Sequence, residues 1–221
     1  MTLKNLKKIV AKYALRYIPK KKIIGIGTGS TISYFIKYLR KIKDSIQGAV
    51  SSSNHTTISL KKNGIPVIAL NDVDYISIYF DSADEINNNM DMIKGGGAAL
   101  MQEKIIASAS KKFVCMIDYT KKVNVLGKFP LPIEVLPMSY KYVKKELEKL
   151  GGIVKKRKKV ITDNNNYILD IKNLYINNPI YLEKKINNIP GVISVGIFSQ
   201  RQPDILLISN YTQVQTILNK S

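Results

Sequence analysis

The segment KKIIGIGTGST, residues 21–31, joins a short apolar run to a loop in which glycines alternate with hydroxyl side chains. The apolar run predicts a β-strand, and the residues from Ser30 to about Lys43 predict a helix. Backbone N–H groups are unpaired where such a helix begins, and the positive end of its dipole lies there too, which favours an anion. The segment therefore predicts a strand, a tight loop and a helix, with the loop as a candidate anion site.

Outward from this segment, apolar runs alternate with amphipathic stretches through roughly the first 120 residues. A helix is expected before it, at about 3–17. The elements expected after it are strands near 48–53, 66–70, 74–80 and 112–118, and helices across 56–64 and from about Ala98 to Ser110. Strands that alternate with helices at this spacing predict a mostly parallel sheet with helices on both faces, which is a Rossmann-like α/β domain.

The segment 121–132, which contains proline and glycine, predicts a domain boundary. Beyond it, the expected order is strand, helix, strand, strand, helix and strand, at 133–136, 139–150, 152–158, 166–171, 179–188 and 191–198. This is the order of the ferredoxin-like α+β unit. The tail predicts a strand at 204–209 and a helix at 211–220 that rejoin the first sheet. We therefore expect residues 1–127 and 200–221 to form the Rossmann-like catalytic domain, and residues 128–199 to form the smaller ferredoxin-like domain.

The chain is strongly basic, with 35 Lys and Arg against 16 Asp and Glu, a formal net charge of +19 and a pI near 9.8. The cations are nearly all lysines, whereas recognition of bases and bidentate binding of phosphates favour the planar guanidinium of arginine. We therefore expect no nucleic-acid partner, and a positive field that attracts a small anion. The densest cluster, Lys155–Lys159, has no assigned partner. An RNA-binding module built on it is the alternative, although its strands offer few aromatic side chains for stacking.

No apolar run reaches the roughly eighteen residues that a membrane span requires, so no membrane partner is expected. Cys115 is the single cysteine and His55 the single histidine, so a Cys/His zinc site cannot be assembled from this chain. The lone cysteine also excludes an internal disulfide and suits a reducing compartment. These features predict a cytoplasmic protein without a metal site.

The glycine loop at 25–31 matches neither the dinucleotide fingerprint nor the P-loop of nucleoside triphosphate enzymes. Its hydroxyls and free amides suit a single phosphate monoester. The segment SSSNHTT, 51–57, repeats the arrangement after the next strand, and His55 within it is expected at the surface. A plain tight turn with a hydroxyl cap is an equally good interpretation of either loop.

A second polar group lies in DSADEINNNMDMIKGGGAALMQEK, residues 81–104. Asp81 and Asp84 follow an apolar strand, at the sheet edge where ligands bind, although aspartates there also form turns and caps. Lys94 precedes the glycines 95–97, and three glycines in a row suit a backbone that bends sharply or lies close to a ligand. A flexible linker is the alternative, but a helix-forming segment follows at once.

Glu103 falls on the apolar side of that helix, between Ala99 and Ala107. We expect it to point toward the interior. Desolvation of a carboxylate raises its pKa, which suits a general base that works near neutral pH. The alternative is a buried glutamate satisfied by a backbone donor or by Lys104.

These blocks, with LGKFPLPIEVLP and IPGVISVGIF, resemble in sequence and in order those of type A ribose-5-phosphate isomerases. The resemblance extends over nearly the whole chain. It implies the reversible interconversion of ribose 5-phosphate and ribulose 5-phosphate through an enediol, in the pentose phosphate pathway and without a metal or organic cofactor. It also implies an α/β domain with an added α+β domain, assembled as a homodimer or homotetramer.

The resemblance implies a role for each candidate site residue. Glu103 would be the base that moves a proton between the first two carbons. Asp81 and Asp84, with Ser82 and Ala83 between them, would bind sugar hydroxyls and assist ring opening. Lys94 and the amides of Gly95, Gly96 and Gly97 would stabilise the oxyanion. The residues expected to hold the substrate and its phosphate are Thr28, Gly29, Ser30, Thr31 and Lys121.

One residue departs from the family, which commonly has glycine where this chain has Ser82. If that position needs a positive φ, serine would strain the loop by about 1 kcal/mol and shift the flanking aspartates. A non-catalytic sugar-phosphate sensor on a related fold is the main rival interpretation. Such a sensor would keep the glycine loop but would have no reason to bury Glu103.

Overall fold

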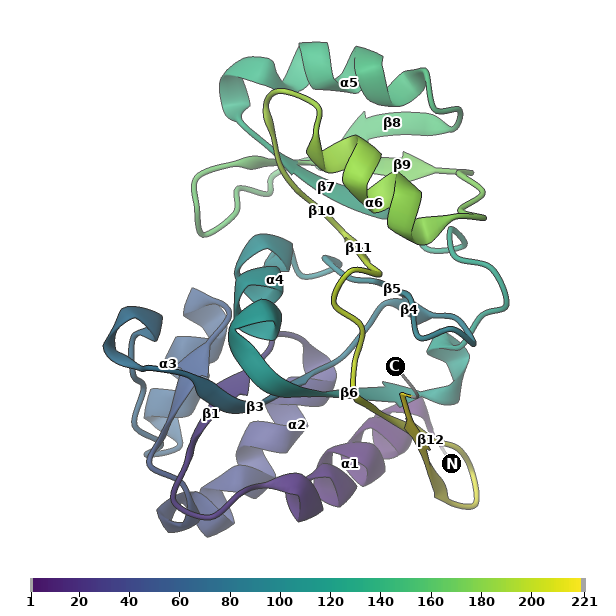
Figure 1. Ribbon diagram of the computed structural model, residues 1–221. Coiled ribbons are helices and arrows are strands. Elements are labelled where there is room, and N and C mark those ends of the chain that lie inside the picture. The colour runs from purple at the N-terminus through teal and green to yellow at the C-terminus, as the bar shows by residue number, and fades with distance from the viewer. Residues whose placement is uncertain (1, 220–221) are drawn as a thin grey trace. The chain divides into compact units, whose positions relative to one another are not determined.

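The computed structural model describes residues 2–219, which form two compact units (Figure 1). The first unit comprises the described residues up to Ala83, residues 102–121, and those from Pro203 onward. The second comprises residues 84–101 and 122–202. Residues 84–101 thus group with the second unit, whereas the sequence-based division places them in the first. The domain boundaries themselves stay a prediction.

The first unit is built on a six-stranded sheet with the order β13-β12-β6-β3-β1-β2. Its strands are β1 (Ile23–Ile26), β2 (Gly48–Ser51), β3 (Ile76–Asp81), β6 (Ser110–Asp118), β12 (Ile205–Ser209) and β13 (Val214–Leu218). All neighbours pair in parallel except the edge strand β13, which is antiparallel to β12. The predicted Rossmann-like, mostly parallel sheet is therefore confirmed.

Helices lie on both faces of this sheet and bury the side chains of its strands. On one face, Ile24, Ile26, Ile78 and Phe80 pack into a core with α1 (Leu3–Ala14) and α2 (Ser30–Leu39). The other face includes Gly25, where a Cβ atom would lie 2.8 Å from Ile106 of α4 (Leu100–Ala109). The remaining helical segments of this unit are α3 (Asn54–Lys62) and the 3-10 turns at Leu15–Tyr17, Arg40–Ser45, Leu70–Asp72 and Tyr119–Lys121.

The second unit contains a four-stranded antiparallel sheet with the order β10-β7-β9-β8. Its elements are β7 (Leu131–Val135), α5 (Tyr140–Glu148), β8 (Ile153–Lys156), β9 (Tyr167–Lys172), α6 (Pro179–Asn187) and β10 (Val192–Val195), with a 3-10 turn at Pro137–Ser139. Chain order and sheet order together are those of the predicted ferredoxin-like unit. Its core joins one face of the sheet to Val143 and Leu147 of α5 and Ile186 of α6.

Three short strands of the second unit were not predicted as separate elements, although residues 197 and 198 fall within the strand predicted at 191–198. They are β4 (Glu85–Ile86), β5 (Met92–Ile93) and β11 (Ile197–Phe198), which form a small antiparallel sheet with β5 in the middle. Two residues are too few for a hydrophobic period, so no pattern in the sequence marks them.

Two predicted elements were wrong. The segment 66–70 is not a strand, because its pairing with β2 ends after one bridge, between Val67 and Ala49, and a 3-10 turn begins at Leu70. The tail at 211–219 forms β13 instead of a helix, since its β-branched residues Val214, Thr216 and Ile217 suit a strand on the open edge of β12. Residue 220 of the predicted helix lies outside the described residues.

The helices within residues 2–219 include none whose length and apolar content would let it cross a bilayer.

Candidate functional site

The carboxyl ends of the parallel strands bring four polar segments to one edge of the first unit. Strands β1 and β3 are neighbours, and the chain continues from β1 to β2 on one side of this pair and from β3 to β6 on the other. In such sheets a ligand binds where the strand order reverses. The segments are Gly27–Thr31 after β1, Ser52 and Ser53 after β2, Asp81 at the end of β3, and the turn with Lys121 after β6.

Hydroxyl groups tie the loops after β1 and β2 together. Oγ1 of Thr28 lies 2.9 Å from Oγ of Ser52 and donates to Oγ of Ser53 at 2.8 Å. Oγ1 of Thr56 donates to the Gly27 carbonyl at 2.7 Å, and Ser53 also caps α3 by accepting from the Thr56 N–H. The cap interpretation of the segment 51–57 is thus confirmed for Ser53. His55 is exposed, as predicted.

The N-terminus of α2 carries the groups of an anion site. Gly29 is its N-cap and has a φ of 122°, a conformation that favours glycine. Ser30 and Thr31 begin the helix, whose first turn contains no acidic residue. Lys7 of α1 donates from Nζ to Oγ of Ser30 at 3.0 Å. A cation, a hydroxyl and a helix N-terminus together favour a phosphate. The sequence analysis missed Lys7, because no local pattern pairs it with a residue so far along the chain.

Asp81 is fully buried, and both of its carboxylate oxygens accept hydrogen bonds. Oδ1 accepts from the N–H of Thr28 at 3.2 Å and from that of Ser82 at 2.8 Å. Oδ2 accepts from the hydroxyl of Tyr79. A Cβ atom at Gly27 would lie 2.0 Å from Cγ of Asp81, so only glycine fits there. These contacts fix the carboxylate at the predicted end of β3.

Tyr79 is a buried residue of the same strand that the sequence analysis did not select. Burial raises the pKa of its phenol well above the ordinary value, and the nearby carboxylates of Asp81 and Glu103 raise it further. The phenol therefore stays protonated at neutral pH and acts as a hydrogen-bond donor to Asp81. Within an apolar strand, a tyrosine fits the pattern of an ordinary core residue, so the sequence does not mark Tyr79 as a site residue.

Glu103 lies on α4 with 3% of its surface exposed. The prediction that it points into the protein is confirmed. Its charge acts on Tyr79, the partner of Asp81, so the first unit holds two buried carboxylates near one buried phenol. Its role as a base remains a prediction at this point.

In the second unit, the loop Lys94–Gly97 is shaped around a carboxylate. The N–H of Gly96 donates to Oδ2 of Asp84 at 2.7 Å, and a Cβ atom at Gly96 would lie 2.6 Å from Oδ1 of the same residue. Gly95 has a φ of 106° and lies against Pro132, to which an added Cβ would come within 3.1 Å. The predicted need for glycine is confirmed at these two positions. Gly97 is exposed.

Lys94 is 2% exposed although it carries an ammonium group. Its N–H donates to the carbonyl of Gly196 at 2.8 Å, and its Nζ lies 5.5 Å from the ring centroid of Phe198. The aromatic face offers a buried cation partial compensation for lost water. This environment holds the side chain beside β11.

The neighbouring acidic residue Glu85 has a structural task. Its carboxylate accepts from the N–H groups of Gly127, at 2.9 Å, and of Phe129. It therefore holds the segment that leads into β7, and its two oxygens are engaged within the second unit.

The other predicted site residues take ordinary conformations. Ser82 is half-buried and is not among the described residues with a positive φ, so the predicted strain does not arise. Ala83 is buried, and Lys121 is half-buried at the end of its 3-10 turn. Asp81 belongs to the first unit and Asp84 to the second.

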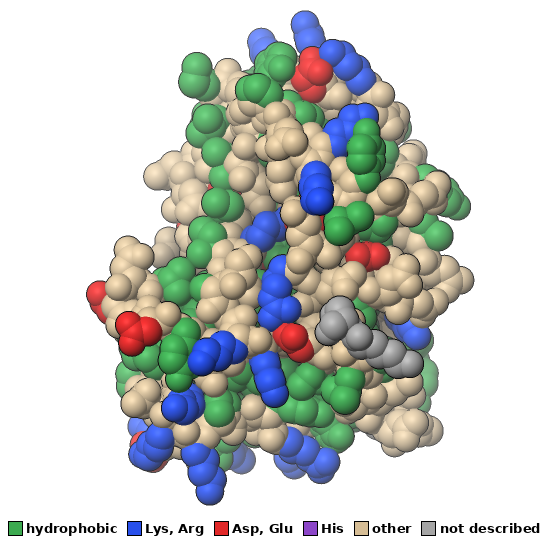
Figure 2. All heavy atoms as spheres, in the orientation of Figure 1, with side chains coloured by type: hydrophobic (Ala, Val, Ile, Leu, Met, Phe, Trp, Pro, Cys, Tyr) green, Lys and Arg blue, Asp and Glu red, His purple; other side chains and the backbone are tan. Residues whose placement is uncertain are grey.

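The cationic side chains are scattered on the face of the molecule that Figure 2 shows. Lys and Arg side chains lie at many separate places on the face shown in Figure 2, with other side chains between them. Within the predicted cluster, Lys155, Lys156, Lys158 and Lys159 are exposed, whereas Arg157 is half-buried and bonded to the protein itself.

Fold and site together define a doubly wound α/β protein with a candidate anion site at its switch point and buried carboxylates beside it, an arrangement suited to an enzyme that binds a small anionic ligand. Residues 48–212 match the family model described as ribose 5-phosphate isomerase A (phosphoriboisomerase A). A protein of that name from Buchnera aphidicola subsp. Schizaphis graminum (strain Sg) is 58% identical over 99% of this chain and 100% of its own. Its counterpart from Buchnera aphidicola subsp. Acyrthosiphon pisum (strain Tuc7) is 58% identical over 100% of this chain and 99% of its own.

Solved structures agree with these matches. Ribose 5-phosphate isomerase A from Neisseria gonorrhoeae has a TM-score of 0.97 and 42% identity, covering 100% of this chain and 99% of that one. A D-ribose-5-phosphate isomerase in complex with phospho-erythronic acid has a TM-score of 0.94 and 39% identity, covering 99% and 100%. The chain belongs to the ribose 5-phosphate isomerase A family. The resemblance seen in the sequence, the fold class and the assignment as an isomerase of this family are thereby confirmed.

Proposed function

We propose that this chain interconverts ribose 5-phosphate and ribulose 5-phosphate through an enediol, with Glu103 as the general base. The observation that carries the proposal is the buried carboxylate of Glu103 in a chain of this family. A base shielded from water and held on a helix is suited to moving a proton between adjacent carbons. Family membership alone would not single out this residue.

In the proposed reaction, Glu103 removes the proton from C2 of the open-chain aldose. The electron pair forms a C1–C2 double bond, and the C1 carbonyl oxygen takes the negative charge and a proton, which gives the enediol. Loss of the proton from the C2 hydroxyl and return of a proton from Glu103 to C1 then give the ketose. No atom is gained or lost, so the reaction needs no redox partner.

The remaining residues bind and stabilise. We assign the phosphate to the N-terminus of α2, with Ser30, Thr31, Lys7 and Lys121 as its ligands. The relative solved with phospho-erythronic acid supports a phosphorylated sugar as the ligand. Lys94 and the amides of Gly95–Gly97 would stabilise the oxyanion, because preorganised donors act most strongly where charge develops.

Asp81 and Asp84 would bind sugar hydroxyls and assist ring opening. Each is already oriented within its own unit by backbone N–H donors, Asp81 by two and Asp84 by one. Fixed carboxylates suit this task, because a group that needs no reorganisation costs less in the transition state. We further propose that the enzyme works in the cytoplasm, in the non-oxidative pentose phosphate pathway, as a homodimer or homotetramer without a metal or organic cofactor.

The test is formation of ribulose 5-phosphate from ribose 5-phosphate in chelator-treated buffer. Glu103→Gln keeps the shape of the side chain but removes the base, and should lower kcat by about 10²- to 10⁴-fold. Glu148→Gln, an equal charge change on the exposed end of α5, is the matched control and should leave kcat unchanged. If the wild type is inert but ribose 5-phosphate still raises its melting temperature, the proposed isomerase activity is wrong and the chain is a sugar-phosphate sensor.

A further inference from the structure

Arg157 is the one arginine of the cluster Lys155–Lys159, and its side chain turns away from solvent. Its guanidinium pairs with Asp170 on the neighbouring strand β9, from Nε to Oδ2 at 2.8 Å and from Nη2 to Oδ1 at 2.5 Å. The two side chains are 19% and 17% exposed, respectively. Such a bidentate pair fixes the guanidinium plane as well as its position.

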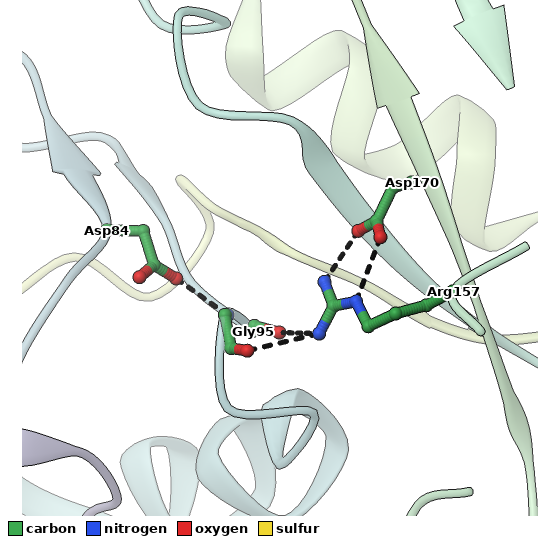
Figure 3. Close-up of polar contacts among 5 residues, drawn as sticks. Asp84, Gly95, Arg157 and Asp170 are labelled. Atoms are coloured by element: carbon green, nitrogen blue, oxygen red, sulfur yellow. Dashed lines mark hydrogen bonds and ion pairs between the residues drawn. The ribbon is translucent and has the colours of Figure 1, made fainter. Parts of the chain in front are cut away.

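The remaining nitrogen of that guanidinium reaches the glycine loop. Nη1 donates to the carbonyl of Gly95 at 3.0 Å and to that of Gly96 at 3.1 Å (Figure 3). The Gly95 carbonyl and the Gly96 N–H belong to one peptide group, and that N–H donates to Oδ2 of Asp84 at 2.7 Å. One peptide thus joins Arg157 to Asp84, with an opposite charge at each end.

This arrangement strengthens both hydrogen bonds of the peptide. A cation at the carbonyl and a carboxylate at the N–H polarise the group in the same sense. Both bonds are charge-assisted, which makes them shorter and stronger than neutral ones. The orientation of the Gly95–Gly96 peptide and the position of the Asp84 carboxylate are therefore coupled to Arg157.

Lysine could not take this place. Arg157 uses two nitrogens for Asp170 and a third for the two carbonyls, whereas an ammonium group is a single point that cannot hold both sets in a fixed plane. The backbone of Arg157 is itself anchored, because its N–H donates to the carbonyl of Ile168 at 2.8 Å. The arginine is thus built into the sheet of the second unit.

We propose that Arg157, held by Asp170, is a positioning residue for the isomerase reaction, which acts by orienting the Gly95–Gly96 peptide and the carboxylate of Asp84. The inference rests on the proposed function, since it assigns these groups to substrate binding and oxyanion stabilisation. Arg157 itself need not touch the substrate. The cluster that the sequence analysis left without a partner thereby gains a role for its central residue.

The test compares the steady-state kinetics of Arg157→Ala, Arg157→Lys and Asp170→Asn with those of the wild type. Misplacing a catalytic group by about 1 Å costs up to about 10²-fold, so Arg157→Ala should lower kcat about 10- to 100-fold. KM should rise by a smaller factor than kcat falls, since the oxyanion contacts act mainly in the transition state, whereas the contacts of Asp84 with sugar hydroxyls act in both states. Arg157→Lys keeps the charge but should stay closer to Arg157→Ala than to the wild type. Asp170→Asn, which leaves the arginine in place, should lower kcat by a smaller factor.

Lys158→Ala is the matched control, because it removes an equal charge from the adjacent, exposed residue and should keep wild-type kcat. Amide hydrogen exchange of the segment 94–97, without substrate, should be faster in Arg157→Ala than in the wild type. If the wild type is active and Arg157→Ala has the same kcat, the positioning role is wrong, even if the melting temperature of Arg157→Ala is lower. An inert wild type would refute the proposed function, and with it any catalytic role for Arg157. Hydrogen exchange would then still decide whether Arg157 orders the loop.

Discussion

The position of Asp81 can be predicted from the sequence, whereas its close contact with Gly27 cannot. Its place after an apolar strand follows from the pattern of β3 alone. The need for glycine at Gly27, imposed by the 2.0 Å approach of an added Cβ to Asp81, follows only from the pairing of β1 with β3. Glu103 was placed correctly because its burial depends on one helix period. Lys7 and Arg157 were not found, since each acts on residues brought near by the fold.

Tyr79→Phe tests the hydrogen bond that holds Asp81. The variant should lose about 1–3 kcal/mol of unfolding free energy at pH 7, because a buried carboxylate loses a donor. Thermal unfolding of the two proteins at pH 7 measures this difference. An unchanged melting temperature would show that the phenol contributes nothing to holding Asp81.

The same pair of proteins should respond differently to alkaline pH. The pKa of Tyr79 is raised in the folded protein, so above about pH 10 an unfolded chain loses this proton while the folded one keeps it. The tyrosine's contribution is complete below about pH 10 and is lost as pH rises further. The melting temperature of the wild type should therefore fall more steeply above pH 10 than that of Tyr79→Phe. Equal slopes in the two proteins would contradict the raised pKa.

At the scale of elements, local periodicity predicted the long helices and buried strands well. It failed where an element depends on an edge or on very few residues. The tail became β13 because β12 offered an open edge, and the short strands β4 and β5 carry too few residues for a pattern. At the N-terminus of α2, the sequence correctly predicted that the helix begins at Ser30, but it predicted neither the N-cap Gly29, where a hydroxyl cap was the alternative, nor the cation Lys7.

Lys7→Gln tests the anion site formed by α1 and α2. Loss of a charged donor beside Ser30 should raise KM for ribose 5-phosphate about 10-fold, while kcat changes less, because phosphate binding persists from ground state to transition state. Lys4→Gln, the same charge change at an exposed position of α1, is the control. Equal KM values for the two variants would remove Lys7 from the phosphate site.

At the scale of the whole molecule, the chain carries a net charge of +19, and on the face shown in Figure 2 the Lys and Arg side chains lie at separate places. The field should draw in a phosphorylated sugar, and added salt should screen it. We expect kcat/KM to fall as NaCl is raised from about 0.01 M to about 0.15 M, with kcat nearly constant. An uncharged crowding solute at matched viscosity serves as the control. A kcat/KM that does not respond to salt would show that the charge plays no part in substrate capture.

Proton exchange at C2 of ribose 5-phosphate in D₂O, followed by nuclear magnetic resonance, tests the role of Glu103 most directly. The wild type should catalyse both ketose formation and deuterium incorporation at the reacting carbons. Glu103→Gln should lose both together while its melting temperature and phosphate affinity stay near those of the wild type. Deuterium incorporation by Glu103→Gln at the wild-type rate would contradict the central claim, because another group would then be removing the proton.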